Sequence, residues 1–270
     1  AAYGLRKLSE AYSGDALRVR RSSDDSEQDM GFIRDDLDAE ALESFCAGAD
    51  CFVSIWYDQS GNTNNATQSD ASRQPKIYDT ADGVSQDSRG NLAVDFDGVD
   101  DYLLGNGVDL RVEDEVSIVM VSNALSDRDP DDAWFGGGYA QLFFEGVDLS
   151  GETFLSVQQN KVNWEFGHGS LQDPDPEYNR PSSIGTDYTL TTVIHNGTTE
   201  NLYIDGGSSV FTFTTERFLA DAKRSFWLGR APAGWGYAHG DILEIIITKS
   251  ALSVAERSEV TNYLTTKYGL

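Results

Sequence analysis

Residues 45–68 read FCAGADCFVSIWYDQSGNTNNATQ, and the organisation of the chain can be worked out from this stretch. Cys46 and Cys51, the two cysteines of the chain, stand at its start. The apolar run 52–57 predicts a buried strand, and the segment 58–65, rich in Asp, Ser, Gly and Asn, predicts a turn. The cysteine spacing favours a disulfide formed in an oxidising compartment, with two reduced buried thiols as the alternative.

Short elements are expected before this stretch and many strands after it. Residues 2–10 predict a short helix, 16–19 a strand, and 39–45 a second short helix capped by Asp38. Residues 205–207, Asp-Gly-Gly, predict a hairpin turn, and the Asp-Gly at 97–98 a tight reversal with a positive φ at Gly98. Further strands are expected at 74–78, 92–96, 116–121, 141–145, 154–158, 163–166, 188–195, 201–204, 210–213, 226–229 and 241–248.

The C-terminal segment has a different pattern, which is typical of a helix. Ser253 and Glu256 form a capping box at the start of an amphipathic segment, 254–267. Its period places Val260, Tyr263 and Leu264 on the inward face. Closely spaced strands with Gly and Asp between them, followed by one helix, indicate an all-β sandwich rather than alternating β-α units. Without a linker-like segment, the 270 residues predict a single domain, 1–270.

The charge of the chain excludes some partners. Its 45 acidic and 20 basic residues give a net charge of -25, which argues against nucleic acid because phosphate contacts need Lys and Arg. No apolar run approaches the ~20 residues that membrane insertion needs. The acidic residues serve either solubility in a salty medium or calcium binding. The candidate Ca²⁺ ligands are Asp127, Asp129, Asp131 and Asp132, with Asp97, Asp100 and Asp101 as a second set.

A sugar-binding surface needs aromatic faces beside polar groups. Trp134 and Trp235 each stand in a Gly-rich segment, where a core position is harder to explain than in a strand. The predicted ligand-binding residues are therefore Trp134, Trp235, Tyr139, Tyr237 and His239. The other tryptophans stand in predicted strands and are expected in the core: Trp56, Trp164 and Trp227.

The sequence YSGDALRVRRSSDD at 12–25, followed by residues 45–68, resembles the start of the catalytic domain of fungal family-54 α-L-arabinofuranosidases. The resemblance implies a concanavalin A-like β-sandwich with a disulfide between Cys46 and Cys51. It covers the first 70 or so residues.

The catalytic set that this resemblance implies is incomplete. The family's nucleophile is a Glu on a mid-chain strand, for which Glu145 is the nearest candidate, although Phe and Gly stand at 143 and 146 where the family has Asp and Asn. The family's acid lies in a Gly-Gly-Asp-Asn turn after a Leu-Gly pair, but Leu228-Gly229 is followed here by Arg-Ala-Pro-Ala. The family's adjacent cysteine pair is also missing. Glu145 is otherwise a solvated strand carboxylate, and a different pair, such as Glu165 with Asp241, stays open.

A second resemblance covers FDGVDDYL at 96–103, GDILEIIIT at 240–248 and ALSVAERSEVTNYLTTKYG at 251–269, which look like laminin-G-like domains of the concanavalin A-like superfamily. Together the two resemblances predict a concanavalin A-like jelly-roll β-sandwich with short N-terminal helices and a C-terminal helix. Such modules mostly bind carbohydrate or serve as structural attachments.

The function predicted from these observations is a non-catalytic carbohydrate-binding, lectin-like or attachment module. It would belong to an extracellular adhesin or a phage tail or fibre protein, and would lie outside the cell or on the virion surface. Its expected partner is a glycan. The alternatives are a glycoside hydrolase related to α-L-arabinofuranosidases, with Glu145 as its nucleophile, and a purely structural virion or surface domain in a homo-oligomer.

Overall fold

The computed structural model describes residues 1–87, 89–108, 115–123, 140–144, 153–157, 161–166, 177–179, 188–214, 224–230 and 237–270. The elements of the N-terminal part are β1 (Ala2–Gly4), β2 (Leu17–Arg21), β3 (Glu27–Met30), β4 (Phe32–Ile33), β5 (Asp36–Leu37), α1 (Ala39–Cys46), β6 (Cys51–Trp56), β7 (Ala66–Thr67), the 3-10 helix η1 (Ala71–Arg73), β8 (Lys76–Asp79), β9 (Gly83–Val84) and β10 (Val94–Asp97).

The remaining elements are almost all strands. They are β11 (Leu103–Val108), β12 (Val116–Ser122), β13 (Ala140–Phe144), β14 (Thr153–Val157), β15 (Lys161–Phe166), β16 (Glu177–Asn179), β17 (Thr189–His195), β18 (Thr199–Ile204), β19 (Ser209–Thr214), β20 (Arg224–Leu228), β21 (His239–Thr248) and α2 (Val254–Tyr268).

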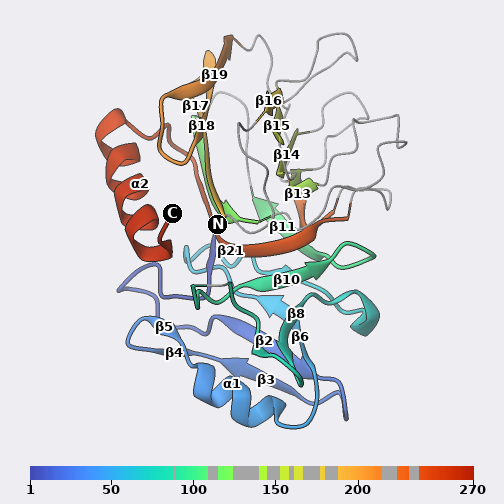
Figure 1. Cartoon of the computed structure of the whole chain (residues 1–270). Helices are drawn as coiled ribbons and strands as arrows, with labels where there is room; N and C mark the ends of the chain where they lie inside the picture. The colour runs from blue at the N-terminus through green and yellow to red at the C-terminus, as the bar shows by residue number, and fades with distance from the viewer. Residues whose placement is uncertain are drawn as a thin grey trace.

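Antiparallel pairing arranges the strands in two layers. The first layer runs β3-β2-β6-β8-β10-β21-β12-β17-β18-β19. The second runs β7-β11-β20-β13-β14-β15-β16, and β7 also pairs with β6, which joins the layers. In Figure 1 the N-terminal strands and α1 lie at the bottom, β10 and β21 cross the middle, and α2 covers the outer side of β17 and β18. The predicted all-β sandwich is confirmed.

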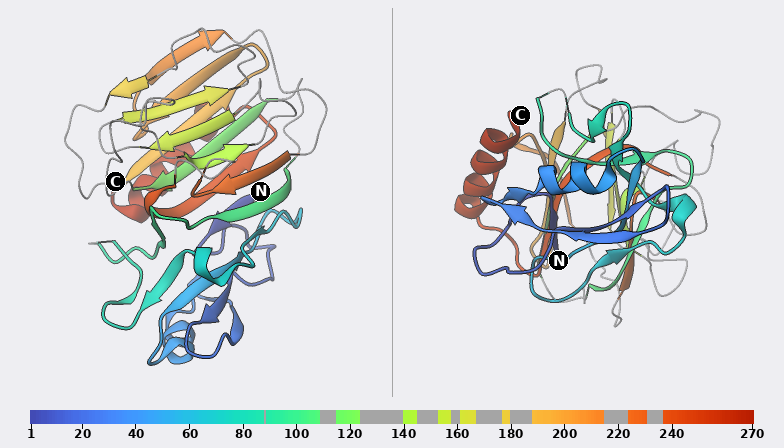
Figure 2. Two further views of the ribbon diagram at one scale, coloured as in Figure 1. Left: turned by 90° about the vertical axis from the view of Figure 1, so that its right-hand side faces the viewer. Right: turned by 90° about the horizontal axis from the view of Figure 1, so that it is seen from below.

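The core lies between the two layers. Residues 116–121 of β12 are buried throughout, as expected of a strand with β21 on one side and β17 on the other. Trp56 and Trp227 are buried, as predicted, and the Tyr3 ring lies 5.9 Å from both Trp56 and Phe226. Figure 2 shows the same arrangement from the right-hand side of Figure 1, looking onto the strands, and from below.

The helix predicted for residues 2–10 is wrong, because residues 2–4 form the strand β1, which pairs antiparallel with β21. Tyr3 and Leu5 are both buried, a spacing of two that suits a strand. The turn after β6 holds this strand in place, since a carboxylate oxygen of Asp58 accepts the Ala2 N–H at 2.8 Å. Tertiary pairing therefore overrides the local helical pattern.

The predicted disulfide is confirmed, and so is the helix that leads to it. Cys46, at the end of α1, is bonded to Cys51, at the start of β6, and both are buried. Asp38 caps α1, because its Oδ1 accepts the Ala41 N–H at 3.0 Å. The disulfide and the Asp58 turn thus fix both ends of β6.

The C-terminal helix and its capping box are confirmed, but one inward residue is wrong. Leu264 is buried as predicted, whereas Tyr263 is 52% exposed and has the Arg6 guanidinium 4.7 Å above its ring. Thr261 and Tyr268 complete the buried stripe, at spacings of three and four from Leu264. In the part of the chain that the structure describes, neither helix is long and apolar enough to cross a membrane.

Candidate functional site

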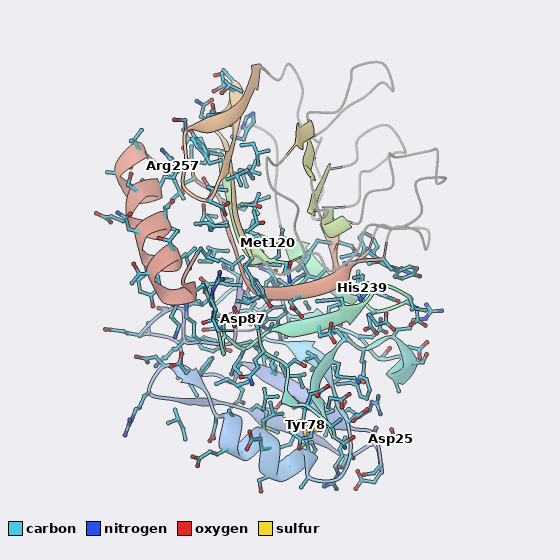
Figure 3. The ribbon with its side chains drawn as sticks, in the orientation of Figure 1. Asp25, Tyr78, Asp87, Met120, His239 and Arg257 are labelled. Atoms are coloured by element: carbon cyan, nitrogen blue, oxygen red, sulfur yellow. A yellow bond between two sulfur atoms is a disulfide. The ribbon has the colours of Figure 1, made fainter. Side chains whose placement is uncertain are left out.

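Polar side chains gather on one face where β10 pairs with β21. The sequence VDFD of β10 lies opposite HGDI of β21, so that Asp95 pairs with Asp241 and Asp97 with His239. Alternate residues of a strand point to the same side, so these four share one face while the fully buried Phe96 points to the other. Figure 3 shows His239 at the start of β21, and Asp87 near the opposite end of β10.

A cavity of about 480 Å³ lies over part of this face. Asp95 and Asp241 line it from β10 and β21, and its remaining wall comes from β8, β9 and the segment after them. Its volume lies within the range of small-ligand sites. The wall residues are Lys76, Asp79, Asp82, Gly83, Val84, Ser85, Gln86 and Asp87.

The two carboxyl groups of this pair bind protons more readily than free aspartates. Burial raises the pKa of Asp241 to about 6, and the charges of Asp95 and Asp87 add to this, although Tyr188 Oη donates a hydrogen bond to Asp241 Oδ2 at 2.6 Å. Burial also raises the pKa of Asp95, against the opposing charges of His239 and Lys76. Lys76 lies directly across from Asp95 on β8. Burial thus raises the pKa of both carboxyl groups, and a proton on one of them relieves the repulsion between the pair.

The turn from β10 to β11 carries a second group of carboxylates. Oxygen atoms of Asp97, Asp100 and Asp101 lie within 4.8 Å of one another, a spacing that could hold a divalent cation. Burial, followed by the charge of Asp97, raises the pKa of Asp101 to about 8. Gly98 has φ +77°, and a Cβ there would lie 2.6 Å from His239 Cβ, so the predicted positive φ is confirmed and the His239 side chain packs against the turn.

An arginine and two tyrosines lie at the neighbouring end of β20. The Arg230 guanidinium carbon lies 3.8 Å above the Tyr102 ring, and Arg230 Nη1 donates to Tyr237 Oη at 3.5 Å. The Ala238 N–H donates to the Gly229 carbonyl at 2.7 Å, which ties the start of β21 to this end of β20. A Cβ at Gly229 would lie 2.4 Å from Phe96, so glycine is required beside β10.

Some of the predicted site residues lie close together in the structure. Tyr237 and His239 lie near each other at the start of β21, and Asp97, Asp100 and Asp101 form one group beside His239. The suggested pair of Glu165 with Asp241 stays a prediction, since β15 pairs with β14 and β16 in the second layer, whereas the strand partner of Asp241 is Asp95 in the first. The predicted residues that lie outside the described part of the chain are Trp134, Trp235, Tyr139, Glu145, Asp127, Asp129, Asp131 and Asp132.

The sequence reasoning missed Asp95, Tyr102 and Arg230 as members of a site. The alternation in VDFD showed that Asp95 faces away from the core side of its strand. No local signal showed that β10 pairs with β21 in the register that opposes Asp95 and Asp241, because those positions are 146 residues apart in the sequence, 241 minus 95.

Comparison with known proteins gives a match in the N-terminal part. Residues 1–124 match the family model "Alpha-L-arabinofuranosidase B, catalytic". Alpha-L-arabinofuranosidase B of Aspergillus kawachii is 36% identical over 90 residues, which are 33% of this chain and 17% of that protein. The α-L-arabinofuranosidase of Hypocrea jecorina is 39% identical over 64 residues, 23% of this chain and 13% of that protein. The predicted resemblance of the N-terminal part is confirmed, while the matches span less than a fifth of these relatives.

Solved structures extend the likeness of fold over nearly the whole chain. A family-54 α-L-arabinofuranosidase soaked with a cyclic sulfate inhibitor superposes with a TM-score of 0.70 at 16% identity, covering 97% of this chain and 61% of that one. An arabinofuranosidase complexed with arabinofuranosyl-α-1,2-xylobiose gives 0.65 at 16% identity, with the same coverage. At this identity the superpositions establish the fold.

The prediction of a non-catalytic, lectin-like adhesion or virion module is therefore wrong. The family model that matches residues 1–124 is that of a catalytic domain, and the relatives are named as α-L-arabinofuranosidases. The wrong prediction came from the missing acid after Gly229, because the mechanism that the resemblance implies needs two carboxylates and one of them has no counterpart there.

Proposed function

We propose that this chain is the catalytic part of a glycoside hydrolase that cleaves α-L-arabinofuranosyl linkages. The observation that carries the proposal is the match of residues 1–124 to the catalytic family model. The matched segment includes the disulfide, the Asp58 turn and the cavity wall from Lys76 to Asp95.

Asp95 and Asp241 are the catalytic carboxyl groups in this proposal. Retaining glycosidases use two carboxyl groups about 5 Å apart, and directly opposed residues of antiparallel strands have Cβ atoms about 5 Å apart. Both residues line the same cavity. Other described carboxylates lie in the cavity wall, but only these two are directly opposed across a strand pair.

The surroundings of the two groups give them different roles. Asp241, whose pKa is about 6, is the acid that protonates the departing glycosidic oxygen. Asp95, with Lys76 opposite, attacks the anomeric carbon as the carboxylate and forms a glycosyl ester. Water, deprotonated by Asp241, then cleaves this ester and releases arabinose, which returns both groups to their starting protonation states.

Turnover of 4-nitrophenyl α-L-arabinofuranoside by the wild type, D95N, D241N and E145Q tests both the function and the assignment. We expect kcat to fall by about 10²–10⁴ in D95N and D241N, since each removes a group required for bond cleavage. E145Q should stay near the wild type. The wild-type kcat/KM should fall as the pH rises above about 6, because Asp241 then loses its proton.

Two outcomes would contradict different parts of the proposal. Loss of activity in E145Q, with D95N and D241N active, would move the nucleophile to Glu145 and overturn the cavity assignment alone. A wild type that releases no arabinose from aryl arabinofuranosides or from arabinose-substituted oligosaccharides would overturn the function. Circular dichroism of each variant separates loss of activity from loss of folding.

The proposal also covers the glycan partner, the location of the protein, its oligomeric state and calcium binding. An arabinose-bearing glycan is the expected partner, and the Cys46–Cys51 disulfide supports an extracellular location. A homo-oligomer stays a prediction. Calcium binding also stays a prediction, for which the described residues offer Asp97, Asp100 and Asp101.

A further inference from the structure

Arg230 has an unusual environment for a basic residue of this chain. Acidic residues outnumber basic ones 45 to 20, yet no carboxylate of the described residues pairs with Arg230. Its Nε is buried without a hydrogen-bond acceptor. Its one hydrogen bond within the described part of the chain is the long one to Tyr237 Oη, at 3.5 Å. The two terminal nitrogens, Nη1 and Nη2, therefore retain most of their capacity to donate to an anion, whereas the buried Nε lies out of a ligand's reach.

Tyr102 brings a second arginine to the same place. The Arg230 guanidinium stacks on the Tyr102 ring, and the Tyr102 N–H donates to the Arg73 carbonyl oxygen at 3.1 Å, which places Arg73 beside Tyr102. Burial acts to raise the pKa of Tyr102, but the nearby Gln68, Arg73 and Arg230 side chains outweigh it and lower the pKa below its ordinary value. Two arginines thus lie beside Tyr102, and one of them, Arg73, also contacts Asp70 at 3.4 Å.

We propose that Arg230 and Arg73 bind a carboxylate of a uronic-acid residue in the glycan that carries the arabinofuranosyl group. The planar guanidinium fork matches a carboxylate with two parallel hydrogen bonds, and Tyr237 Oη adds a donor beside it. Arg230 lies close to β21, the strand of Asp241, because Ala238, just before that strand, donates a hydrogen bond to Gly229, the neighbour of Arg230. The inference rests on the proposed function, and it narrows the substrate to arabinose on an acidic polysaccharide.

Calorimetric titration at constant ionic strength tests this site without catalysis. The probes are trigalacturonate, its carboxyl-reduced neutral counterpart and a sulfated galactotriose. We expect the wild type to bind trigalacturonate at least about tenfold more tightly than the neutral trisaccharide, as hydrogen bonds to charged groups contribute roughly this factor. R230Q should lose the preference, and R73Q should weaken it.

R257Q is the matched control. The Arg257 guanidinium lies 4.0 Å over the Tyr203 ring, so this variant removes the same charge and the same kind of stacking. Figure 3 shows Arg257 on α2, far from His239 and the start of β21. R257Q should therefore keep the full preference for trigalacturonate. R73Q keeps the test valid if R230Q fails to fold.

Three results would overturn the inference. The first is equal binding of trigalacturonate and the neutral trisaccharide by the wild type. The second is a folded R230Q and a folded R73Q that both keep the full preference for trigalacturonate. The third is tighter binding of the sulfated trisaccharide than of trigalacturonate by the wild type. Turnover of neutral 4-nitrophenyl α-L-arabinofuranoside reports on the proposed function separately. Turnover without uronate preference refutes this site alone, and uronate preference without turnover refutes the hydrolase proposal alone.

Discussion

Asp241 illustrates how one residue connects the fold to the chemistry. Its carboxyl group is held largely out of water on β21, with the Tyr188 hydroxyl as a hydrogen-bond donor at 2.6 Å. Burial is the largest cause of its raised pKa, because a charged carboxylate loses more solvation than a neutral one. The same burial that favours a proton donor also makes the ionised form costly for the folded state.

The stability of the protein should therefore depend on pH through Asp241. Below about pH 4 the carboxyl group is protonated in both the folded and the unfolded chain. Between about 4 and 6 only the unfolded chain releases the proton, so the free energy of unfolding falls as the pH rises, and this loss is complete above about pH 6. D241N should remove a penalty on the order of 2 kcal/mol at pH 7 and none at pH 4. Urea unfolding at the two pH values measures the difference.

Asp79, in the wall of the same cavity, provides a control of opposite sign. Its bond to Lys76 Nζ at 2.6 Å is the largest cause of its lowered pKa. The stabilisation from ionised Asp79 is present above about pH 4 and lost as the pH falls, so D79N should destabilise the protein at pH 7 and not at low pH. An equal response of D241N at both pH values would show that the burial of Asp241 does not govern its titration.

At the scale of elements, Glu244 connects three segments that are far apart in the sequence. Glu244 lies on β21 and is 1% exposed. Arg6, just after β1, donates to both of its carboxylate oxygens at 2.7 and 2.8 Å. Tyr268, in the last turn of α2, donates at 2.7 Å. The N-terminal strand and the C-terminal helix are thus held to the same buried charge.

E244Q should destabilise the fold by about 3–5 kcal/mol, because it leaves the Arg6 cation buried without its counter-charge. The Arg6 side chain is only 13% exposed, so solvent cannot replace the lost carboxylate. D36N is the control, since the Asp36–Lys267 pair is more exposed and should contribute at most about 1 kcal/mol. Chemical denaturation compares the two variants, and equal effects would mean that Glu244 does not join these elements.

At the scale of the whole molecule, a net charge of -25 acts on the folded state as a repulsion. Salt screens this repulsion, with a Debye length of about 10 Å at 0.1 M. The melting temperature should therefore rise by several degrees as NaCl increases from about 0.02 M to 0.5 M. At pH 4, where many carboxylates are protonated, the increase should be much smaller. A melting temperature that does not change with salt at pH 7 would contradict this expectation.

The sequence by itself determined the features that depend on local pattern and covalent geometry. These include the disulfide loop and its strand, the buried run of β12, the 205–207 hairpin and the capping box of α2. Each depends on residues close in the chain, or on a period that shows which side of an element is buried. The same signals failed at residues 2–10, where a strand partner more than 200 residues away decided the structure.

Only the tertiary structure decided which polar groups meet. Asp95 and Asp241 face each other because β10 and β21 pair in one register, and a shift of one residue would turn Asp241 to the opposite face. Arg230 and Tyr102 meet because β11 and β20 are neighbours. Strand pairing is set by packing over the whole core. The sequence therefore shows which polar residues are present, but it does not show which of them lie next to one another.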